Sequence, residues 1–272
     1  MKYVLVTGAC GGMGSAAVKA YKEAGYFVFA MDRREYEAEE RVMPLVADIT
    51  KESDIVSAFE RVKEVTDNLY AIVHFAGIYM LDSLVEISEE AYIRAFNINV
   101  FGAYRVNKIF LPLLKSGSRI VITTSELAPL DPLPFTGLYA ITKSALDKYA
   151  YSLRMELQLL GVYVAVLRPG AVKTDMLGVS TDALDAFCEK SELYTCNAQR
   201  FKSIVNKVEA RHVPPKKVAD KSLKILKRRK PKQIYKINRN PLLLMLNLLP
   251  RKWQTGIIRL VLKEKKNGKQ QH

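Results

Sequence analysis

Tyr139 and Lys143 form a pair of side chains that could exchange a proton. They lie in the segment Tyr139-Ala-Ile-Thr-Lys143, within a stretch of helical patterning, where residues four positions apart share one face. A free tyrosine has a pKa of about 10, and a nearby ammonium favours the phenolate. We therefore expect Lys143 to lower the Tyr139 pKa, so that the phenol can act as an acid or base near neutral pH. Taken alone, the same spacing is also common in ordinary surface helix pairs.

A glycine-rich turn follows the first apolar segment of the chain. Gly8, Gly11, Gly12 and Gly14 lie where an apolar run at 2–7 gives way to a helical pattern at 12–24. Glycine at such a junction lets the backbone approach a pyrophosphate closely, and the helix N-terminus offers free N–H groups to phosphates. The turn therefore predicts a dinucleotide site, although glycine is frequent in turns of every kind.

Asp32 ends the second predicted strand, 24 residues after Gly8. A carboxylate at this place can bind both ribose hydroxyls of an adenosine and would repel a 2′-phosphate, which favours NAD over NADP. Arg33 and Arg34 follow directly, and either side chain could turn onto a phosphate. The other interpretation of Asp32 is a simple turn residue.

The elements that must position these residues alternate along the chain. Strands are predicted at 2–7, 26–31, 41–47, 70–76, 118–125, 162–170 and 233–238, and helices at 12–24, 51–66, 88–115, 138–160 and 214–230. Repeated strand–helix–strand units favour an α/β fold, a doubly wound parallel sheet with helices on both faces. We expect one domain over residues 1–240, with a substrate lobe at about 176–213, followed by a basic, Leu-rich extension over 241–272.

These ordered motifs resemble those of the classical short-chain dehydrogenase/reductase family over roughly residues 2–175. The matching segments are Thr7-Gly8-x-x-x-Gly12-x-Gly14, Asp48-Ile49, Ala76-Gly77, Asn99-Val-x-Gly102, Ser125, Tyr139-x-x-x-Lys143 and Arg168-Pro169-Gly170 with Thr174. The resemblance implies a Rossmann-like fold and hydride transfer between a nicotinamide and a secondary alcohol or ketone. It also implies a homodimer or homotetramer, since the long helices often pair between subunits in this family.

The resemblance also implies a role for each matched residue. Tyr139 would exchange a proton with the substrate oxygen, Lys143 would bind the nicotinamide ribose, and Ser125 would donate a hydrogen bond to the substrate oxygen. Asn99 would anchor a water that connects Lys143 to the solvent. The cofactor contacts would come from Gly8, Gly12, Met13, Gly14, Asp32, Asp48, Ile49, Ala76, Gly77, Tyr139, Lys143, Pro169, Gly170, Val172 and Thr174.

Two departures from the family pattern bear on the site. His74-Phe75 stands where the family has two asparagines, and we interpret His74 as a packed, hydrogen-bonded strand residue. The stretch from Ser125 to Tyr139 is one residue longer than the family pattern. Because this loop would border the substrate, the difference bears on substrate specificity rather than on the catalytic reaction.

The predicted substrate region is rich in apolar side chains, which favours a lipophilic alcohol or ketone such as a steroid, bile acid, retinoid or fatty chain. The residues expected to line it are Met176, Leu177, Leu184, Phe187, Leu193, Tyr194 and Phe201, together with Ile78, Tyr79, Met80, Leu127, Leu130, Leu133 and Phe135. The alternative is that half of them simply pack the lobe.

Charge is distributed unevenly along the 272 residues, whose net charge is +14. From Phe201 onward there are 21 Lys and Arg but 3 Asp and Glu, whereas the first 200 residues are slightly acidic. Apolar clusters flanked by cations in the tail suit peripheral contact with an anionic membrane. A lid over the pocket and a subunit contact remain alternatives, as does a solvated basic surface. No nucleic-acid recognition motif accompanies the basic segment, so we expect no nucleic-acid partner.

Cysteine and histidine usage give further expectations. The three cysteines form no CxxC pair and suit a reduced compartment, and the three histidines are scattered, so no metal site is expected. No apolar run approaches the roughly 18 residues of a membrane span, and we expect a cytoplasmic protein that could associate with membranes. Alternatives to the oxidoreductase are a catalytically silent NAD-binding sensor or scaffold, an epimerase or dehydratase of the same family, and a membrane-associated structural protein.

Overall fold

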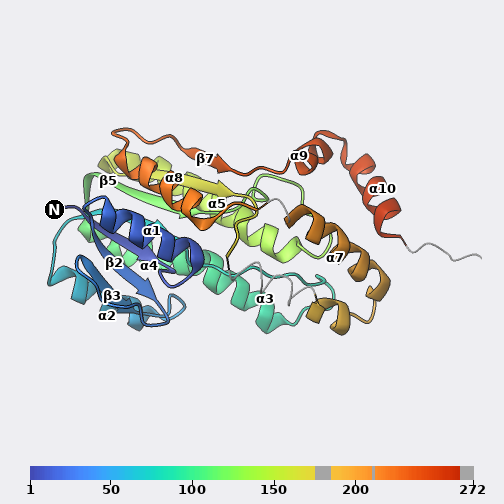
Figure 1. Ribbon diagram of the computed structural model, residues 1–272, viewed down its shortest axis with the longest axis horizontal. Helices are drawn as coiled ribbons and strands as arrows, with labels where there is room; N and C mark the ends of the chain where they lie inside the picture. The colour runs from blue at the N-terminus through green and yellow to red at the C-terminus, as the bar shows by residue number, and fades with distance from the viewer. Residues whose placement is uncertain (175–184, 210–211, 264–272) are drawn as a thin grey trace, which may run out of the picture.

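A seven-stranded sheet forms the centre of the computed structural model, which describes residues 1–174, 185–209 and 212–263 (Figure 1). All neighbouring strands pair in parallel, in the order β3-β2-β1-β4-β5-β6-β7. The strands are β1 (Tyr3–Thr7), β2 (Phe27–Asp32), β3 (Val42–Val46), β4 (Leu69–His74), β5 (Leu114–Thr123), β6 (Tyr163–Pro169) and β7 (Ile234–Ile237). Strand order reverses between β1 and β4, and a crevice for ligands opens at the carboxyl ends of strands at such a point.

Helices cover both faces of the sheet. On one face α1 (Gly12–Glu23) packs against α8 (Pro215–Lys227), and both join a core that includes Val4, Val6 and Ala165. The other face carries α2 (Glu52–Lys63), α4 (Gly102–Phe110) and α5 (Gly137–Leu157) over a second core. Side chains of the central strands alternate between the two cores, so apolar residues fill both sides. The predicted doubly wound α/β fold is confirmed.

The prediction of one long helix over 88–115 is wrong at its C-terminal end, where β5 begins. The helix is also interrupted in its middle. Ser88 caps α3 (Glu89–Phe96) by accepting a hydrogen bond from Ala91 N. A π-helical turn then spans Asn97–Phe101 before α4. Pro112, which has no N–H to donate, lies in a tight 3-10 turn at Leu111–Leu113, and Leu114 already pairs with Leu69 in the sheet.

Helices beyond the carboxyl ends of the strands lie at the right of Figure 1. They include α7 (Thr195–Glu209), α9 (Pro241–Leu248) and α10 (Arg251–Leu262). We call α9 and α10 the cap. Phe201 of α7 and Leu262 of α10 share a small apolar cluster with Leu81. Among the described residues, no helix combines the length and apolar character needed to cross a membrane.

Asp131 anchors the cap to the loop between β5 and α5. Its backbone N–H donates to the Asn247 side-chain oxygen at 2.7 Å, and its carboxylate accepts from Arg251 at 2.9 Å and from Gln254 at 3.3 Å. A second attachment joins Asn240 N to the Glu126 carboxylate at 2.7 Å. The cap is therefore held by the same loop that follows Ser125.

Candidate active site

The residues singled out by their chemistry come together at the carboxyl edge of the sheet. The glycine turn follows β1, Asp32 ends β2, Ser125 follows β5, and Pro169 ends β6. Tyr139 and Lys143 come from the first two turns of α5, which runs back over this edge. Parallel strands place all of these ends on one side, which is why residues so far apart in sequence meet.

The glycine turn leaves no room for side chains at Gly8 and Gly14. Gly8 has a φ of +71°, and a Cβ there would lie 2.6 Å from Ala76 N. A Cβ at Gly14 would lie 2.0 Å from Gly8 O. No side chain caps the first turn of α1, which begins five residues after the carboxyl end of β1. An uncapped helix N-terminus behind a bare backbone fits the pyrophosphate of a dinucleotide.

Asp32 is held in place by two backbone N–H groups. Cys10 N donates to Oδ2 at 3.0 Å, and Arg34 N donates to Oδ1 at 3.1 Å. The carboxylate keeps accepting capacity for two hydroxyls. The Arg34 guanidinium donates to Cys10 O at 2.9 Å beside it. The donors of the turn and this carboxylate together fit an adenosine dinucleotide.

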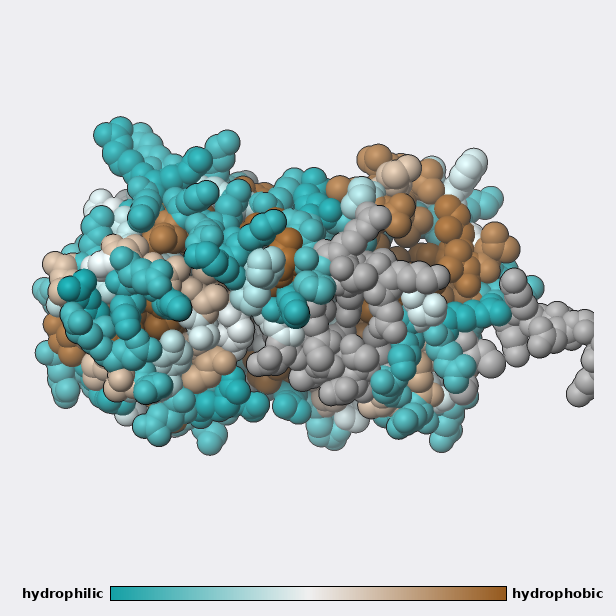
Figure 2. Space-filling view, in the orientation of Figure 1, coloured by the Kyte–Doolittle hydropathy of each residue, from teal (hydrophilic) through white to brown (hydrophobic). Residues whose placement is uncertain are grey.

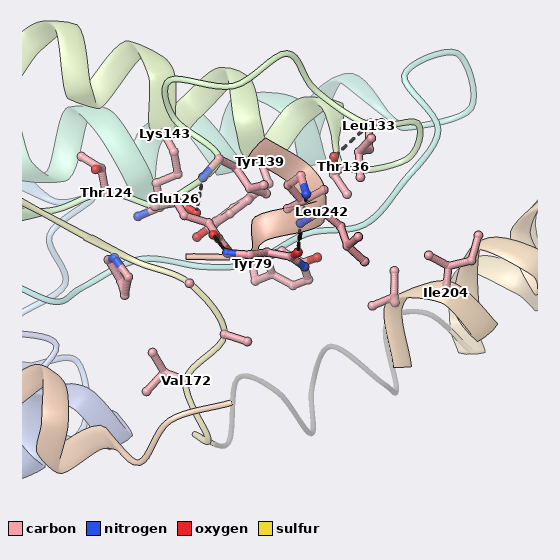
Figure 3. A pocket seen from close by; sticks show the side chains of 18 of the residues that line it. Tyr79, Thr124, Glu126, Leu133, Thr136, Tyr139, Lys143, Val172, Ile204 and Leu242 are labelled. Carbon is pink, nitrogen blue, oxygen red and sulfur yellow. Dashed lines mark hydrogen bonds between the residues drawn. The ribbon is translucent and has the colours of Figure 1, made fainter. Parts of the chain in front are cut away.

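Ser125, Tyr139 and Lys143 line the same pocket. Figure 3 shows Tyr139 and Lys143 on its wall. The Ser125 hydroxyl accepts from Leu127 N at 3.2 Å and lies close enough to the Tyr139 phenol to lower its pKa. Lys143 Nζ is buried, donates to Thr123 O at 3.4 Å, and lies 5.7 Å from the centroid of the Tyr139 ring. A hydroxyl donor, a phenol and an amine therefore border the same small space.

The expectation that Lys143 lowers the pKa of Tyr139 is wrong, because the pKa of Tyr139 is raised. Burial raises the pKa of Tyr139 to about 12, against the effect of the Ser125 hydroxyl, and the Glu126 carboxylate adds to the rise. Burial also lowers the pKa of Lys143 to about 8. Each group is desolvated, so each favours its neutral form. Tyr139 is thereby a proton donor at neutral pH.

Asn99 occupies the π-helical turn and is bound to the loop after β4. Its Oδ1 accepts from Ile78 N at 2.8 Å, and its Nδ2 donates to Ile78 O at 3.0 Å and to Thr142 Oγ1 at 3.1 Å. A methyl group at Gly77 would lie 3.1 Å from Asn99 Oδ1 and 3.2 Å from Lys143 Nζ. The side chains of Asn99 and Lys143 therefore converge on Gly77. The water that Asn99 would anchor stays a prediction.

The remaining cofactor candidates divide into two groups. Met13, Pro169, Gly170, Val172 and Thr174 line the pocket with the catalytic cluster, and a Cβ at Gly12 would lie 2.8 Å from the Thr174 methyl. Asp48 and Ile49 follow β3 near the far edge of the sheet. There Thr50 N donates to the Asp48 carboxylate at 2.9 Å, and Ile49 packs on Gly102.

His74 is the packed residue that the sequence predicts. It is buried on β4, its Nε2 lies 2.8 Å from Asn107 Oδ1, and its Nδ1 lies 3.5 Å from Thr7 Oγ1. Burial lowers the pKa of His74 to about 4, so the ring is neutral at physiological pH. It tethers β4 to β1 and α4 on the sheet side of the site.

Glu126 is a site residue that the sequence analysis missed. It lines the pocket one residue after Ser125, its carboxylate accepts from Asn240 N, and burial raises its pKa. The signal in the sequence is a carboxylate at the head of an otherwise apolar loop. Tyr79 was expected only as lining, yet its ring packs edge-on against Tyr139 with 4.7 Å between the centroids.

Asp147 and Arg168 form a second feature that the sequence analysis missed. The Arg168 guanidinium donates two hydrogen bonds to the Asp147 carboxylate, at 2.9 and 2.6 Å, and both side chains are largely buried. Thr124 Oγ1 donates to the same carboxylate at 3.3 Å. The pair thus fixes α5, which carries Tyr139 and Lys143, to the ends of β5 and β6.

The pocket above the cluster has a volume of about 350 Å³ and a mostly aliphatic wall. Of the expected lining residues, Ile78, Tyr79, Leu127, Leu133 and Phe201 border it. Leu193 was expected there wrongly, because its side chain is exposed, and the Phe135 ring instead packs with Phe187, Tyr194 and Phe201. Met176, Leu177 and Leu184 lie outside the described residues.

The cap supplies the part of the wall that the sequence analysis did not assign. These residues are Leu242, Leu243 and Leu246 of α9 and Ile257, Ile258, Val261 and Leu262 of α10. Within residues 1–174, 185–209 and 212–263, no group of three or more His, Cys, Asp or Glu side chains could hold a metal ion.

Comparisons with known proteins agree with this geometry. The family model described as short chain dehydrogenase matches residues 2–185. Estradiol 17-beta-dehydrogenase 2 of Mus musculus is 35% identical over 189 residues, which make up 65% of this chain and 50% of that protein. The chain therefore spans about half the length of this relative.

Two further similar proteins are covered over more of their length. The 3-ketodihydrosphingosine reductase of Bacteroides thetaiotaomicron is 25% identical over 78% of this chain and 85% of its own. Among solved structures, the 3-ketoacyl-(acyl-carrier-protein) reductase of Brucella melitensis complexed with NADH superposes with a TM-score of 0.70 at 20% identity, covering 87% of this chain and 95% of that one. The second likeness shows the fold alone.

Proposed function

The chain belongs to the short-chain dehydrogenase family, and we propose that it is a nicotinamide-dependent oxidoreductase interconverting a secondary alcohol and a ketone on a lipophilic substrate. The observation that carries the proposal is the convergence of Ser125, Tyr139 and Lys143 beside a glycine turn fit for a pyrophosphate. A nicotinamide dinucleotide, when bound, supplies the hydride chemistry.

The residues of this chain handle the proton and the oxygen. In the reducing direction, Tyr139 holds its proton at neutral pH and donates it to the substrate oxygen, while the Ser125 hydroxyl donates a second hydrogen bond that stabilises charge on that oxygen. Lys143, at the bottom of the pocket, is placed to contact a ribose and to supply a proton to the emptied phenolate. Apolar side chains of the cap line the space in which this exchange would take place.

We propose NAD rather than NADP as the cofactor. The Asp32 carboxylate is fixed by Cys10 N and Arg34 N, and its remaining acceptor sites suit two ribose hydroxyls but repel a phosphate. Arg34 is engaged with Cys10 O. The ratio of kcat/KM with NADH to that with NADPH tests this point, and an Asp32→Ala variant is expected to lower it.

A lipophilic substrate is supported by the wall of the pocket. Aliphatic side chains from the cap and from the loop after β5 surround the catalytic cluster, and the polar side chains lie near its base. Two of the relatives carry names of lipophilic substrates, estradiol and 3-ketodihydrosphingosine. We propose a steroid, bile acid, retinoid or long-chain ketone as the class.

A panel of such ketones and alcohols, read by the nicotinamide absorbance, tests the function. With an active compound in hand, Tyr139→Phe is expected to lower kcat by about 10²–10⁴-fold and to leave NADH binding within about twofold. Tyr151→Phe, at an exposed position of the same helix, is the control and is expected to keep full activity. Equal turnover by the Tyr139→Phe protein would refute the assignment.

The rival functions give different outcomes in the same assay. NADH binding without turnover of any compound would favour a catalytically silent sensor or scaffold. A cofactor that stays bound through purification and is not consumed would favour an epimerase or dehydratase. A silent sensor does not need a proton donor and a hydroxyl donor in one pocket, as Tyr139 and Ser125 are placed. An epimerase that oxidises and re-reduces its substrate does need them, so retention of the cofactor is what separates it from the dehydrogenase.

A further inference from the structure

The solvent-exposed side of the cap is strongly apolar. Leu248 is 84% exposed, Leu260 is 80% exposed and Trp253 is 65% exposed. Figure 2 shows hydrophobic side chains gathered over α9 and α10. Side chains of this kind in one patch mark an interaction site rather than an ordinary surface. We call this patch the outer face; its residues are Leu242, Met245, Leu248, Trp253, Ile257, Leu260 and Val261.

Cations border the outer face, and acids are absent from its sequence. Between residues 239 and 263 there are five Lys and Arg and no Asp or Glu. Lys252 and Arg259 are seven residues apart on α10 and exposed, so they share a stripe beside the stripe of Trp253 and Leu260. An apolar stripe flanked by a basic one is the pattern of a helix lying in the interface of an anionic membrane.

The outer face is continuous with the mouth of the pocket. Leu242, Ile257 and Val261 are exposed on the outer face, and all three also line the pocket. The inner side of the same helices is bound to the protein, with Ile258 and Leu262 packed on the Phe201 cluster and Asn197 Nδ2 donating to Leu262 O. The cap therefore presents an apolar rim around the opening rather than a free helix.

We propose that the outer face docks the protein on a lipid bilayer that contains anionic lipid, with the pocket opening into the bilayer surface. Charge favours this occupant over a second copy of the chain, because two outer faces brought together would juxtapose like cations with no acid to pair them. A bilayer accepts the apolar stripe in its interface and the cations at its headgroups. The transfer of a substrate through the mouth rests on the proposed function, whereas the docking does not.

The single tryptophan of the chain lies on this face and reports on the docking directly. Full-length protein is mixed with phosphatidylcholine vesicles, with and without phosphatidylserine, in the absence of substrate and cofactor. We expect the Trp253 emission to shift to the blue with the anionic vesicles and to be quenched by brominated acyl chains. Salt is expected to weaken binding, because it screens the cations.

Variants separate the apolar from the electrostatic contribution. Leu248→Ser with Leu260→Ser, neither of which lines the pocket, is expected to weaken vesicle partitioning about tenfold or more. The matched control is Leu159→Ser with Leu160→Ser, which removes leucines that are 83% and 60% exposed far from the cap in sequence. Lys252→Gln with Arg259→Gln is expected to weaken binding to the anionic vesicles by about tenfold.

Three outcomes would overturn the proposal. One is wild-type protein that remains in the supernatant with an unshifted Trp253 emission. Another is a loss of vesicle partitioning in the Leu159→Ser, Leu160→Ser control that equals the loss in the Leu248→Ser, Leu260→Ser protein. The third is a concentration-dependent dimer, seen by sedimentation velocity without vesicles and lost in the Leu248→Ser, Leu260→Ser protein, which would assign the face to self-association. None of these results touches the dehydrogenase assay, so the two proposals fail separately.

Discussion

At the scale of single residues, the site combines two ionisable groups whose pKa values are both shifted by burial toward the neutral form. Tyr139 is a phenol with a pKa raised to about 12 and Lys143 an amine with a pKa lowered to about 8. The spacing in the sequence places them correctly on one face of α5. It does not give the direction of the Tyr139 pKa, because desolvation depends on what the rest of the chain packs over the pair.

Lys143→Met is expected to raise the free energy of unfolding at pH 7 by about 1–3 kcal/mol in the protein without cofactor. Burial lowers the Lys143 pKa from 10.5 to about 8 in the folded state. Below pH 8 the ammonium is charged in both states and the full desolvation cost opposes folding. Between pH 8 and 10.5 the folded state releases the proton first, so wild-type stability rises with pH in this window.

Urea denaturation of wild type and Lys143→Met at pH 7 and pH 10 measures this effect. The gain from the substitution should be largest at pH 7 and should shrink at pH 10. Lys148→Met, at an exposed position of the same helix, is the control and should change stability little at either pH. A Lys143→Met protein less stable than wild type at pH 7 would contradict a lowered pKa for the buried amine.

At the scale of elements, α5 depends on its attachment to the sheet. The Asp147–Arg168 pair and Thr124 fix it to the ends of β5 and β6. The sequence predicts α5 and both strands from their periodicity. It does not predict this pair, whose members are 21 residues apart and belong to different elements, because periodicity describes one element at a time. The sequence also does not predict the π-helical turn at Asn97–Phe101, because its apolar pattern is that of an ordinary helix.

Asp147→Ala is expected to lower the free energy of unfolding by about 2–4 kcal/mol, because it leaves the largely buried Arg168 guanidinium without its carboxylate. In a double-mutant cycle with Arg168→Ala, the two losses should be less than additive. Asp220→Ala, which removes an exposed pair with Lys216, is the control and should cost less than about 1 kcal/mol. Additive losses in the cycle would show that the pair does not couple α5 to β6.

At the scale of the whole molecule, the sheet and the cap are distinct parts. The two cores beside the sheet draw on residues up to Ile237, and α9 and α10 contribute to neither. Alternating strand and helix patterns were sufficient to predict the parallel sheet and the edge at which the site lies. They were insufficient for the tail, for which a lid, a subunit contact and a membrane contact all remained open. The place of the tail on the rest of the protein depends on contacts such as Arg251–Asp131, between residues 120 positions apart.

A chain shortened to residues 1–240 is expected to retain the sheet, its helices and NADH binding, because both sheet cores stay complete. The pocket would lose the wall formed by the cap, so KM for a lipophilic substrate should rise about tenfold or more. Circular dichroism, NADH fluorescence and steady-state kinetics measure the three properties. Loss of NADH binding on shortening the chain would show that the cap is part of the dinucleotide site.

The hydrogen bond from Asn240 N to Glu126 joins the two ends of this arrangement. Asn240 is the residue from which α9 starts, and Glu126 follows Ser125 and raises the pKa of Tyr139. A displacement of the start of α9 is therefore expected to move the Glu126 carboxylate and with it the pKa of Tyr139.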